Sequence, residues 1–482
     1  MLSKSPLEIP EVAALVASYL TGEDLASCVR VSKSWHDIFL TYRWRVIMRY
    51  RGHEFQHTGP IQEAVINHHH LVRDLRMYGP FEEDRMCTHP NLRILGIMFN
   101  RKTFDWDLAA KTPLLEHLLL SAIEMGPRCL QRLSSLRSLD LQDVTIRDAP
   151  RFWEACKNLE SLSMDEIRFP SGFVPIPADT LFTRLRILSI SYIHRLRYSK
   201  QLAVILHCPK LEFFEWKSPR LGMRILIQQP IHKDRWPPLD NLSIPDEPSD
   251  ADCALAIERI GSRLGKFTFL DLHGGTIGSE AIKSLGPHFG SLVEICLFRA
   301  TSSAVRDVLC SCPMLETLWA PEILAKDIAG GGPWICRQLR NLSTSFCFKE
   351  SEQNLQPVVF ERLSALVRLR FLDMSDPCDD EGGEDGELEF RLDCGLAQLA
   401  SLKELRAVGF STERYGVLQA RRLGANDIEW MMDNWKNLKG ICGCLNRDPK
   451  VRAQLKDQIE HLGILYDEES ITRVDRIKLD LC

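Results

Sequence analysis

The chain has 482 residues, a formal net charge of −5 and a sequence pI near 6.3, so its length predicts several domains or a repeat array. The slight acidity gives no reason to expect nucleic acid or an anionic membrane as a partner. The sequence has no apolar run of 18 or more residues, and its start lacks the apolar core of a signal peptide, which argues against membrane insertion and secretion.

Three short helices are predicted between residues 9 and 44. Pro10 suits the first turn of a helix, because its fixed φ and missing N–H cost nothing there. The apolar residues that follow recur at helical spacing: Val12, Leu15, Val16, Tyr19 and Leu20. Thr21 and Asp24 stand at the spacing of a capping box for a second helix, and Trp35 with Phe39 marks a third. A core this small is marginal alone and is helped by burial against a partner.

The same residues resemble an F-box. The matching pattern is Ile9-Pro10-Glu11-Val12, then Tyr19-Leu20, Asp24-Leu25, Val31, Lys33-Ser34-Trp35 and Trp44, with Ser32 where Cys is common in the family. The resemblance implies a three-helix module that binds a Skp-type adaptor and through it a cullin. It also implies the adaptor-binding residues: Ile9, Pro10, Glu11, Val12, Leu20, Leu25 and Val31. A structural cap on the following repeats is the alternative explanation of this segment.

A repeat of the form L-x-x-L-x-L begins after residue 70. Its copies start at Leu92, Leu115, Leu136, Leu159, Leu185, Leu211, Leu239, Phe267, Leu292, Leu315, Leu339, Leu369, Leu402 and, more weakly, Leu438. Most starts are spaced as in leucine-rich repeats, in which a short strand and a helix alternate and neighbouring units must stack. We therefore predict an α/β fold, an irregular horseshoe-shaped solenoid. Together with the F-box pattern, this resembles fungal-type F-box proteins with leucine-rich repeats.

The predicted domains are a helical module at 1–50, a connection at 51–70, the solenoid at 71–444 and a helical cap at 445–482. Asp448 as N-cap and Pro449 in the first turn predict the start of the cap helix. The segment 376–389, DPCDDEGGEDGELE, predicts a disordered acidic insertion, either a solvated loop or a contact for a basic partner.

Strand residues between the inward leucines should face the concave surface of such a solenoid. In the first half of the chain these are mostly small and polar: His117, Leu119, Ser138, Asp140, Ser161, Ser163 and Ser189. In the second half aromatic residues alternate with carboxylates, a composition typical of interaction hot spots. The predicted substrate-binding residues are Phe213, Glu215, Phe269, Asp271, Glu294, Phe298, Trp319, Phe371 and Asp373. A basic and apolar segment would complement them, and the alternative is that these aromatic residues stack on one another or are covered.

The sequence gives little support for a metal-binding or cofactor-binding site. The 16 cysteines include no C-x-x-C, and Cys310/Cys312 and Cys442/Cys444 lack the matching histidines of a zinc site. The tract His68 to His70 is better explained as a polar connection than as a metal site. Without a signal peptide, scattered cysteines indicate an intracellular setting, cytoplasmic and/or nuclear. We therefore predict no metal and no cofactor.

The resemblance implies the substrate-recognition adaptor of a Skp/cullin/F-box ubiquitin ligase, which binds a target protein on the repeat surface and has no catalytic residue of its own. The alternative is a leucine-rich-repeat scaffold that works without a ligase. An enzyme is disfavoured, because the chain lacks G-x-S-x-G, H-E-x-x-H and P-loop signatures.

Overall fold

A computed structural model describes residues 9–49, 67–78, 89–98, 103–104, 111–126, 133–169, 176, 181–191, 193, 204–205, 207–216, 240–245, 249–259, 264–270, 276–374, 386–410, 423–446 and 448–467. The chain divides into two compact units, Met1–Leu211 and Glu212–Cys482. Each unit carries a parallel sheet whose strands recur along the chain, which is the architecture of a leucine-rich-repeat solenoid.

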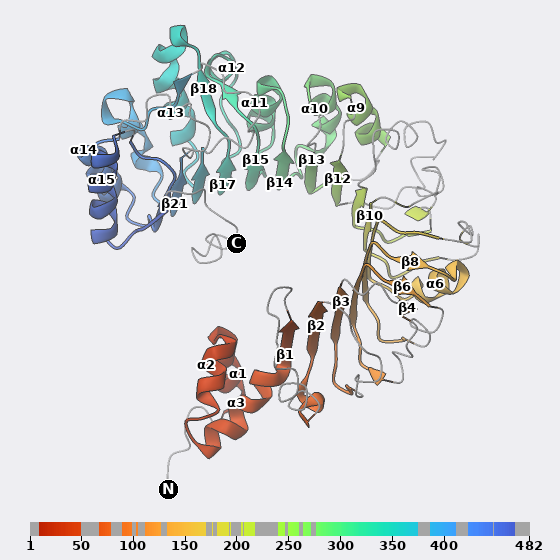
Figure 1. Cartoon of the computed structure of the whole chain (residues 1–482). Helices are drawn as coiled ribbons and strands as arrows, with labels where there is room; N and C mark the ends of the chain where they lie inside the picture. Colours follow the sequence, from red (N-terminus) through yellow and green to blue (C-terminus); the bar gives the residue numbers. More distant parts are fainter. Residues whose placement is uncertain are drawn as a thin grey trace. The chain divides into compact units, whose positions relative to one another are not determined.

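The first unit begins with three helices and continues into a parallel sheet in the order β1-β2-β3-β5-β7-β9-β10 (Figure 1). The helices are α1 (Pro10–Tyr19), α2 (Gly22–Cys28), α3 (Lys33–Arg45) and α6 (Ala149–Cys156), with the 3-10 helix η2 (His69–Leu71). The sheet strands are β1 (Val46–Arg49), β2 (Asp74–Tyr78), β3 (Ile94–Met98), β5 (His117–Ser121), β7 (Ser138–Gln142), β9 (Ser161–Asp165) and β10 (Ile187–Ile190). A second parallel ribbon joins β4 (Thr103–Phe104), β6 (Glu124–Met125) and β8 (Thr145–Ile146).

The second unit has a parallel sheet in the order β11-β12-β13-β14-β15-β17-β19-β21-β22-β23. These strands are β11 (Phe213–Trp216), β12 (Asn241–Pro245), β13 (Lys266–Leu270), β14 (Glu294–Leu297), β15 (Thr317–Trp319), β17 (Asn341–Ser343), β19 (Phe371–Asp373), β21 (Ala407–Gly409), β22 (Gly440–Cys442) and β23 (Leu465–Asp467). The helices are α9 (Asp250–Arg259), α10 (Ser279–Leu285), α11 (Ser302–Ser311), α12 (Ala325–Gly330), α13 (Gln356–Ser364), α14 (Ala425–Asn434) and α15 (Pro449–His461). A smaller ribbon joins β16 (Ile323–Leu324), β18 (Phe346–Phe348) and β20 (Gly386–Glu387). In Figure 1, α9 to α13 line one side of the sheet of this unit.

The repeated leucines form the core because the second residue of each sheet strand, which is the central one in the three-residue strands β15, β17 and β19, points toward the helices. Leu318, Leu342 and Leu372 are aligned in successive strands of the second unit and are fully buried. The residues on either side of this central position face away from the helices, and we call that side of a unit's sheet its open face. Thr317 and Trp319, for example, lie on the open face on either side of Leu318.

The sequence pattern misplaces the start of two repeats by three residues. The strand pairing aligns Phe267 with Ile295 and Phe269 with Leu297, so the first repeat begins at Leu264 rather than at Phe267. In the same way Val408 is aligned with Leu372, so the second begins at Leu405 rather than at Leu402. Apolar residues occur at both frames in each case, and only the hydrogen-bonded register chooses between them.

The sheets extend past the predicted solenoid range of 71–444 at both ends. The helix α3 runs directly into β1, and β1 pairs with β2, so the first strand precedes the expected connection at 51–70. At the other end β23 pairs with β22 beyond α15. The N-cap of α15 is confirmed, because the Asp448 carboxylate accepts a hydrogen bond from the Lys450 N–H at 2.8 Å.

The first unit turns after three successive strands through left-handed residues that are not glycine. Ala122, Asp143 and Glu166 have φ values of 54°, 51° and 53°. They follow β5, β7 and β9, close to the place where leucine-rich repeats usually carry the Asn or Cys that this sequence mostly lacks. Backbone bonds hold these turns, since the Ala122 N–H donates to the Gln142 carbonyl and the Asp143 N–H to the Asp165 carbonyl, both at 2.8 Å. Each such residue costs about 1–2 kcal/mol, which the stacked turns offset.

In the second unit, one helix is capped by a side chain from the preceding repeat. The Asp250 carboxylate, at the start of α9, accepts hydrogen bonds from the backbone N–H groups of Gly278, Glu280 and Ala281 at 2.8, 2.9 and 3.0 Å. These are N–H groups that the first turn of α10 cannot satisfy internally. A Cβ at Gly278 would lie 2.6 Å from a carboxylate oxygen of Asp250, so a larger residue here would displace the carboxylate that caps α10.

Candidate functional site

The three N-terminal helices form a small core of their own. Ala17, Leu25 and Phe39 are buried together, one from each helix. The ring of Phe39 lies 5.4 Å from that of Trp35 and 6.4 Å from that of Tyr42, between their centroids. The core is therefore centred on a single aromatic side chain.

Side chains cap the N-termini of α2 and α3. The Thr21 N–H donates to the Asp24 carboxylate at 2.9 Å, and the Asp24 N–H donates to the Thr21 hydroxyl at 3.2 Å, which confirms the predicted capping box. The hydrogen bonds from the Thr21 hydroxyl and N–H lower the pKa of the Asp24 carboxyl. Ser32, at the position where Cys is common in the F-box pattern, accepts a hydrogen bond from the Trp35 N–H at 3.2 Å and caps α3.

The residues predicted to bind the adaptor differ in exposure. Ile9, Glu11 and Val31 are exposed, whereas Val12 and Leu20 are half-buried. Leu25 is only 8% exposed and belongs to the core of the module, so a direct contact of this side chain with a partner is not available in this structure. Pro10 begins α1, and its side chain lies outside the described residues.

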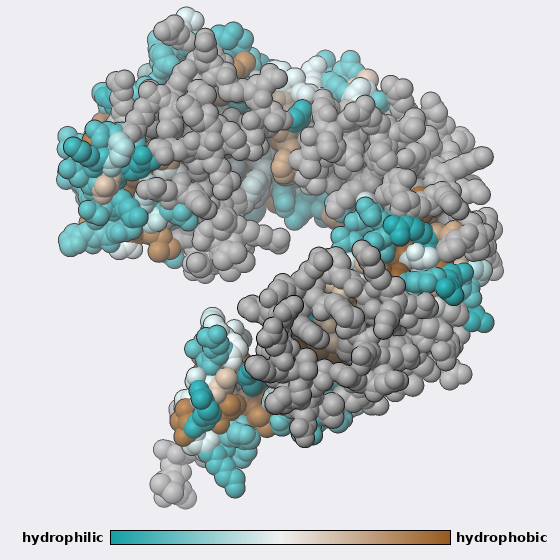
Figure 2. Space-filling model, viewed as in Figure 1, coloured by the Kyte–Doolittle hydropathy of each residue, from teal (hydrophilic) through white to brown (hydrophobic). Residues whose placement is uncertain are grey.

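Two exposed apolar residues of α1 were missed by the sequence pattern. The helical period groups Leu15 and Tyr19 with Val12, Val16 and Leu20 on one face of the helix, but the side chains of Leu15 and Tyr19 are 60% and 82% exposed. The apolar stripe of α1 is wider than the core of the module can cover, so one edge buries Ala13 and Ala17 while the other faces solvent. With Ile9 and Val31 these side chains leave apolar surface on the module. Figure 2 shows brown, hydrophobic atoms on the visible face of the three-helix module. Large exposed apolar residues that lie close together typically mark interaction sites.

The module is joined to the first repeat by backbone and ring contacts. The Arg73 N–H donates to the Arg45 carbonyl at 2.9 Å, which links the end of α3 to the start of β2. The indole of Trp44 stacks on the His68 imidazole with 4.9 Å between ring centroids. The histidine tract thus packs at this junction, and the described part of the chain contains no group of three or more His, Cys, Asp or Glu that could hold a metal ion.

The open face of the second unit carries part of the predicted substrate-binding set. Phe213 and Glu215 lie on β11, Glu294 on β14 and Trp319 on β15, all of them partly exposed. Glu294 forms an ion pair with Lys266 at 2.7 Å. Backbone pairing places Trp319 between Cys296 and Ser343, so its indole has small neighbours along the row.

The other predicted substrate-binding residues are buried or do not lie on an open-face strand position. Phe371 and Asp373 are only 3% and 5% exposed, so they do not form an exposed hot spot. Phe371 packs with Ala407 and Cys442, and the Asp373 carboxylate accepts a hydrogen bond from the Ser343 hydroxyl at 3.4 Å. In the observed register Phe269 is aligned with Leu297 of β14, and its side chain lies outside the described residues. Phe298 follows the end of β14, and Asp271 lies outside the described residues.

In the first unit the small and polar positions lie on the open face as predicted. His117, Ser138 and Ser161 are aligned in one row, and Leu119, Asp140, Ser163 and Ser189 in another. These side chains are exposed or half-buried. They include neither the aromatic residues nor the carboxylate density of the second unit.

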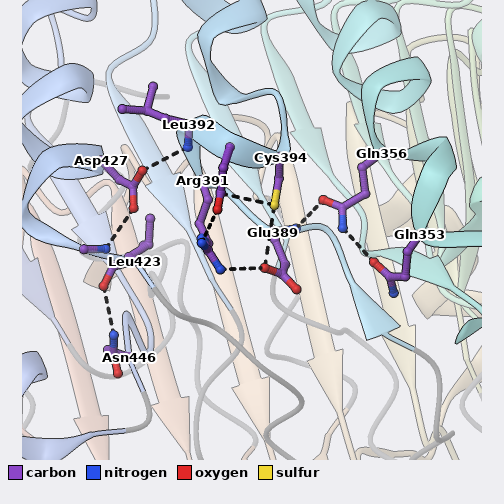
Figure 3. A network of polar contacts seen from close by, with 11 residues as sticks. Gln353, Gln356, Glu389, Arg391, Leu392, Cys394, Leu423, Asp427 and Asn446 are labelled. Atoms are coloured by element: carbon purple, nitrogen blue, oxygen red, sulfur yellow. Dashed lines mark hydrogen bonds and ion pairs between the residues drawn. The ribbon is translucent and has the colours of Figure 1, made fainter.

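The last four residues of the predicted acidic insertion are folded. Gly386–Glu387 form β20, which pairs antiparallel with β18, whereas residues 376–385 lie outside the described residues. Figure 3 shows the polar network that follows this strand. The Gln356 carbonyl oxygen of the side chain accepts a hydrogen bond from the Glu389 N–H at 3.2 Å, and Glu389 forms an ion pair with Arg391 at 3.5 Å.

The other end of this network is a buried aspartate. The Asp427 carboxylate accepts hydrogen bonds from the N–H groups of Leu392 and Gly424 at 3.0 and 2.9 Å (Figure 3). It therefore joins the chain that follows β20 to the start of α14. The end of the acidic segment is consequently a structural part of its repeat.

Burial keeps several thiols protonated. It raises the pKa of Cys208, Cys312 and Cys336 to about 12, and that of Cys296, beside Glu294, also to about 12. A thiol is a good nucleophile only as the thiolate. These cysteines are therefore packing residues.

Comparison with known proteins supports the F-box resemblance of the N-terminal module. Residues 10–49 match the F-box-like family, and no curated protein matches the chain. Among solved structures, an LRR protein of Leptospira interrogans is similar with a TM-score of 0.44 and 14% sequence identity, over 82% of this chain and 90% of that chain. No helix within the described ranges is long and apolar enough to cross a membrane. Residues 10–49 thus form an F-box-like domain, and the stacked parallel strands that follow it form a leucine-rich-repeat solenoid.

Proposed function

We propose that the protein is the substrate-recognition adaptor of a Skp/cullin/F-box ubiquitin ligase, acting in the cytoplasm or the nucleus. The observation that carries the proposal is the apolar surface of the F-box-like module, where Ile9, Leu15, Tyr19 and Val31 are all exposed. Such a surface is costly in water and is stabilised when a partner covers it. The partner in this proposal is a Skp-type adaptor, which in turn binds a cullin.

The chain's own part in ubiquitin transfer is positioning rather than catalysis. Its repeats hold a target protein near a ubiquitin-loaded enzyme, which raises the effective concentration of the reacting groups. The proposed adaptor contact consists of Ile9, Pro10, Glu11, Val12, Leu20 and Val31, to which the structure adds Leu15 and Tyr19. Leu25 contributes indirectly by holding the helices together.

The adaptor contact is tested by removing apolar surface without touching the core. We expect the double substitution Leu15→Ala and Tyr19→Ala to weaken binding of a purified Skp-type adaptor by about 3 kcal/mol, or roughly 100-fold. Binding is measured by biolayer interferometry with the full-length chain. Both side chains are exposed, so the unfolding midpoint should stay unchanged.

A control variant removes two exposed apolar residues from the repeats. Leu114 and Leu181 are 46% and 50% exposed in the same unit, and their double substitution by Ala should leave adaptor binding intact. Equal binding by the Leu15/Tyr19 variant and the wild type would contradict the proposed contact. A folded wild-type chain that binds neither adaptor nor cullin would instead favour a leucine-rich-repeat scaffold that works without a ligase.

For the target protein we propose the open face of the second unit around Trp319, with Phe213, Glu215 and Glu294. Trp319 combines a large apolar ring with partial exposure, which is typical of residues that dominate binding energy. We expect Trp319→Ala to reduce the recovery of specific co-purifying proteins at least tenfold, as measured by quantitative mass spectrometry. Trp319→Phe should retain most of it. A large drop in unfolding midpoint for Trp319→Ala would show instead that the indole is a packing residue.

A further inference from the structure

The open face of the second unit is buried at three adjacent strands. At β19, β21 and β22 every residue on this face is buried: Phe371, Asp373, Ala407, Gly409, Gly440 and Cys442. On β14 and β15 the equivalent residues are half-buried, and on β23 Leu465 and Asp467 are exposed. The burial is therefore confined to these six residues, which we call the covered patch.

Residues of the covered patch do not bury one another to this extent. A ring on one face of a sheet keeps its outer side in solvent unless another layer packs on it. Phe371 is 3% exposed although its neighbours on this face are Asn341 and Ala407, and the small Ala407 is 0% exposed. The helices of this unit, α9 to α15, follow one another along the other side of its sheet (Figure 1). The covered patch therefore carries a second layer, which the chain itself supplies.

Three stretches outside the described residues follow strands near the covered patch: 375–385 after β19, 411–422 after β21 and 468–482 after β23. The first has six carboxylates and no large apolar side chain, so it would not shield Phe371 from water and would repel Asp373. The second joins β21 to α14, so both of its ends are fixed at the edge of the sheet where β21 ends. The third is fixed only at β23.

The stretch 468–482 has the length and the pattern to cover the patch. Because neighbouring strands lie about 4.8 Å apart, roughly 14 Å separate β23 from β19. The residues from 468 to 482 span roughly 50 Å when extended, so the stretch reaches across all three strands. Ile477, Leu479 and Leu481 alternate with polar residues, as in a strand that buries one side.

The charges of the stretch also suit the covered patch. Asp373 is 5% exposed, and its carboxylate lies so close to Gly409 that a Cβ there would come within 2.6 Å of an oxygen. The Ser343 hydroxyl donates to this carboxylate at the long distance of 3.4 Å. A buried carboxylate is stabilised by a nearby cation. Among its apolar residues the stretch carries three cations, Arg473, Arg476 and Lys478.

We propose that residues 471–482 lie across the covered patch as an extended segment. Its apolar side chains pack on Phe371 and Cys442, and one of its cations lies beside Asp373. The covered patch is thus a binding surface for a basic and apolar segment, and the chain itself occupies it. The surface that remains for a target protein is the neighbouring part of the open face around Trp319.

The reactivity of Cys442 tests the proposal in the full-length chain. We expect the triple substitution Ile477→Asp, Leu479→Asp and Leu481→Asp to release the segment, because carboxylates are costly to bury against apolar side chains. Alkylation of Cys442 by iodoacetamide, followed by mass spectrometry, should then become at least tenfold faster. Cys312, buried at the end of α11, should keep its rate. Thermal unfolding checks that the variant is folded.

A second measurement asks whether the released patch binds the segment again. A fluorescein-labelled peptide with the sequence of residues 468–482 is added to the full-length proteins, and binding is followed by fluorescence polarisation. The triple variant should bind the peptide at least tenfold more tightly than the wild type, because the wild-type patch is already occupied.

The control variant places three aspartates on exposed apolar positions elsewhere in the same unit. Leu255, Met314 and Val367 are 44%, 49% and 49% exposed, and their triple substitution by Asp should leave alkylation and peptide binding as in the wild type. An unchanged rate at Cys442 in the first variant, or an equal rise in the control, would overturn the proposal.

A third variant separates the two apolar stretches near the covered patch. The residues replaced by Asp in the stretch 411–422 are Tyr415, Val417 and Leu418. Faster alkylation of Cys442 in this variant and not in the 477/479/481 variant would assign the cover to 411–422 and overturn the proposal. Neither a Skp-type adaptor nor a target protein is present, so failure here leaves the ligase proposal untouched.

Discussion

Substitution of Phe39 by Ala is expected to unfold the N-terminal module while the repeats stay folded. Phe39 has no exposed surface and belongs to the core that all three helices build. Its loss should cost about 3–5 kcal/mol, which exceeds what a module of this size can tolerate. Adaptor binding should disappear, because the helices that carry the exposed apolar residues are no longer folded.

Hydrogen exchange read by mass spectrometry separates this result from global unfolding. Amides of α1, α2 and α3 should lose protection in Phe39→Ala, whereas those of β14 to β22 should keep it. Phe39→Leu, which retains most of the buried volume, should cost only about 1 kcal/mol and keep the adaptor bound. Full protection of α1 to α3 in Phe39→Ala would mean that contacts with the repeats, rather than this core, hold the module.

Substitution of Trp435 by Ala should give the largest loss of stability in the second unit. Trp435 is 1% exposed, and its indole N–H donates to the Leu399 carbonyl at 3.0 Å. Its ring also packs edge-on against Trp430, with 5.6 Å between centroids. Removing the ring leaves a cavity and a carbonyl without its donor, at a cost of about 4–6 kcal/mol.

The variant Trp435→Phe separates the contribution of ring packing from that of the indole hydrogen bond. It keeps most of the apolar volume and loses the hydrogen bond, so we expect a cost of about 1–2 kcal/mol. Urea denaturation of the three proteins gives the free energies of unfolding. In exchange experiments α14 and β22 should open first in Trp435→Ala, because stability in a solenoid is a sum over neighbouring repeats. Equal costs for the Ala and Phe variants would show that the hydrogen bond, not the packing, dominates.

The sequence predicted the repeat, but it did not always predict the residue at which a copy of the repeat begins. Phe267 has apolar residues at the repeat spacing in both directions, as Leu264-x-x-Phe267-x-Phe269 and as Phe267-x-x-Leu270-x-Leu272. The two frames bury similar surface in an isolated strand. Pairing of Phe269 with Leu297 decides between them, and that pairing is a property of the stacked sheet.

Sequence periodicity also did not predict which apolar side chains are exposed to solvent. A helical period groups Leu15 and Tyr19 with Val16 and Leu20, but it does not show how much of the stripe the neighbouring helices can cover. The reverse holds for Phe371, where strand alternation predicts the open face correctly yet the side chain is buried against Ala407 and Cys442. In both cases the outcome depends on residues that are distant in sequence.

By itself the sequence determined the features that depend on local spacing. These are the three helices with the F-box pattern, the capping box of the second helix, the alternation of strand and helix in the repeats, and the N-cap at Asp448. Local spacing suffices for them because caps and periodic faces arise within a few residues.

Only the tertiary structure decided which apolar side chains stay exposed and which frame two repeats adopt. The physical reason is parallel stacking, which brings residues about thirty positions apart to within one strand spacing of each other.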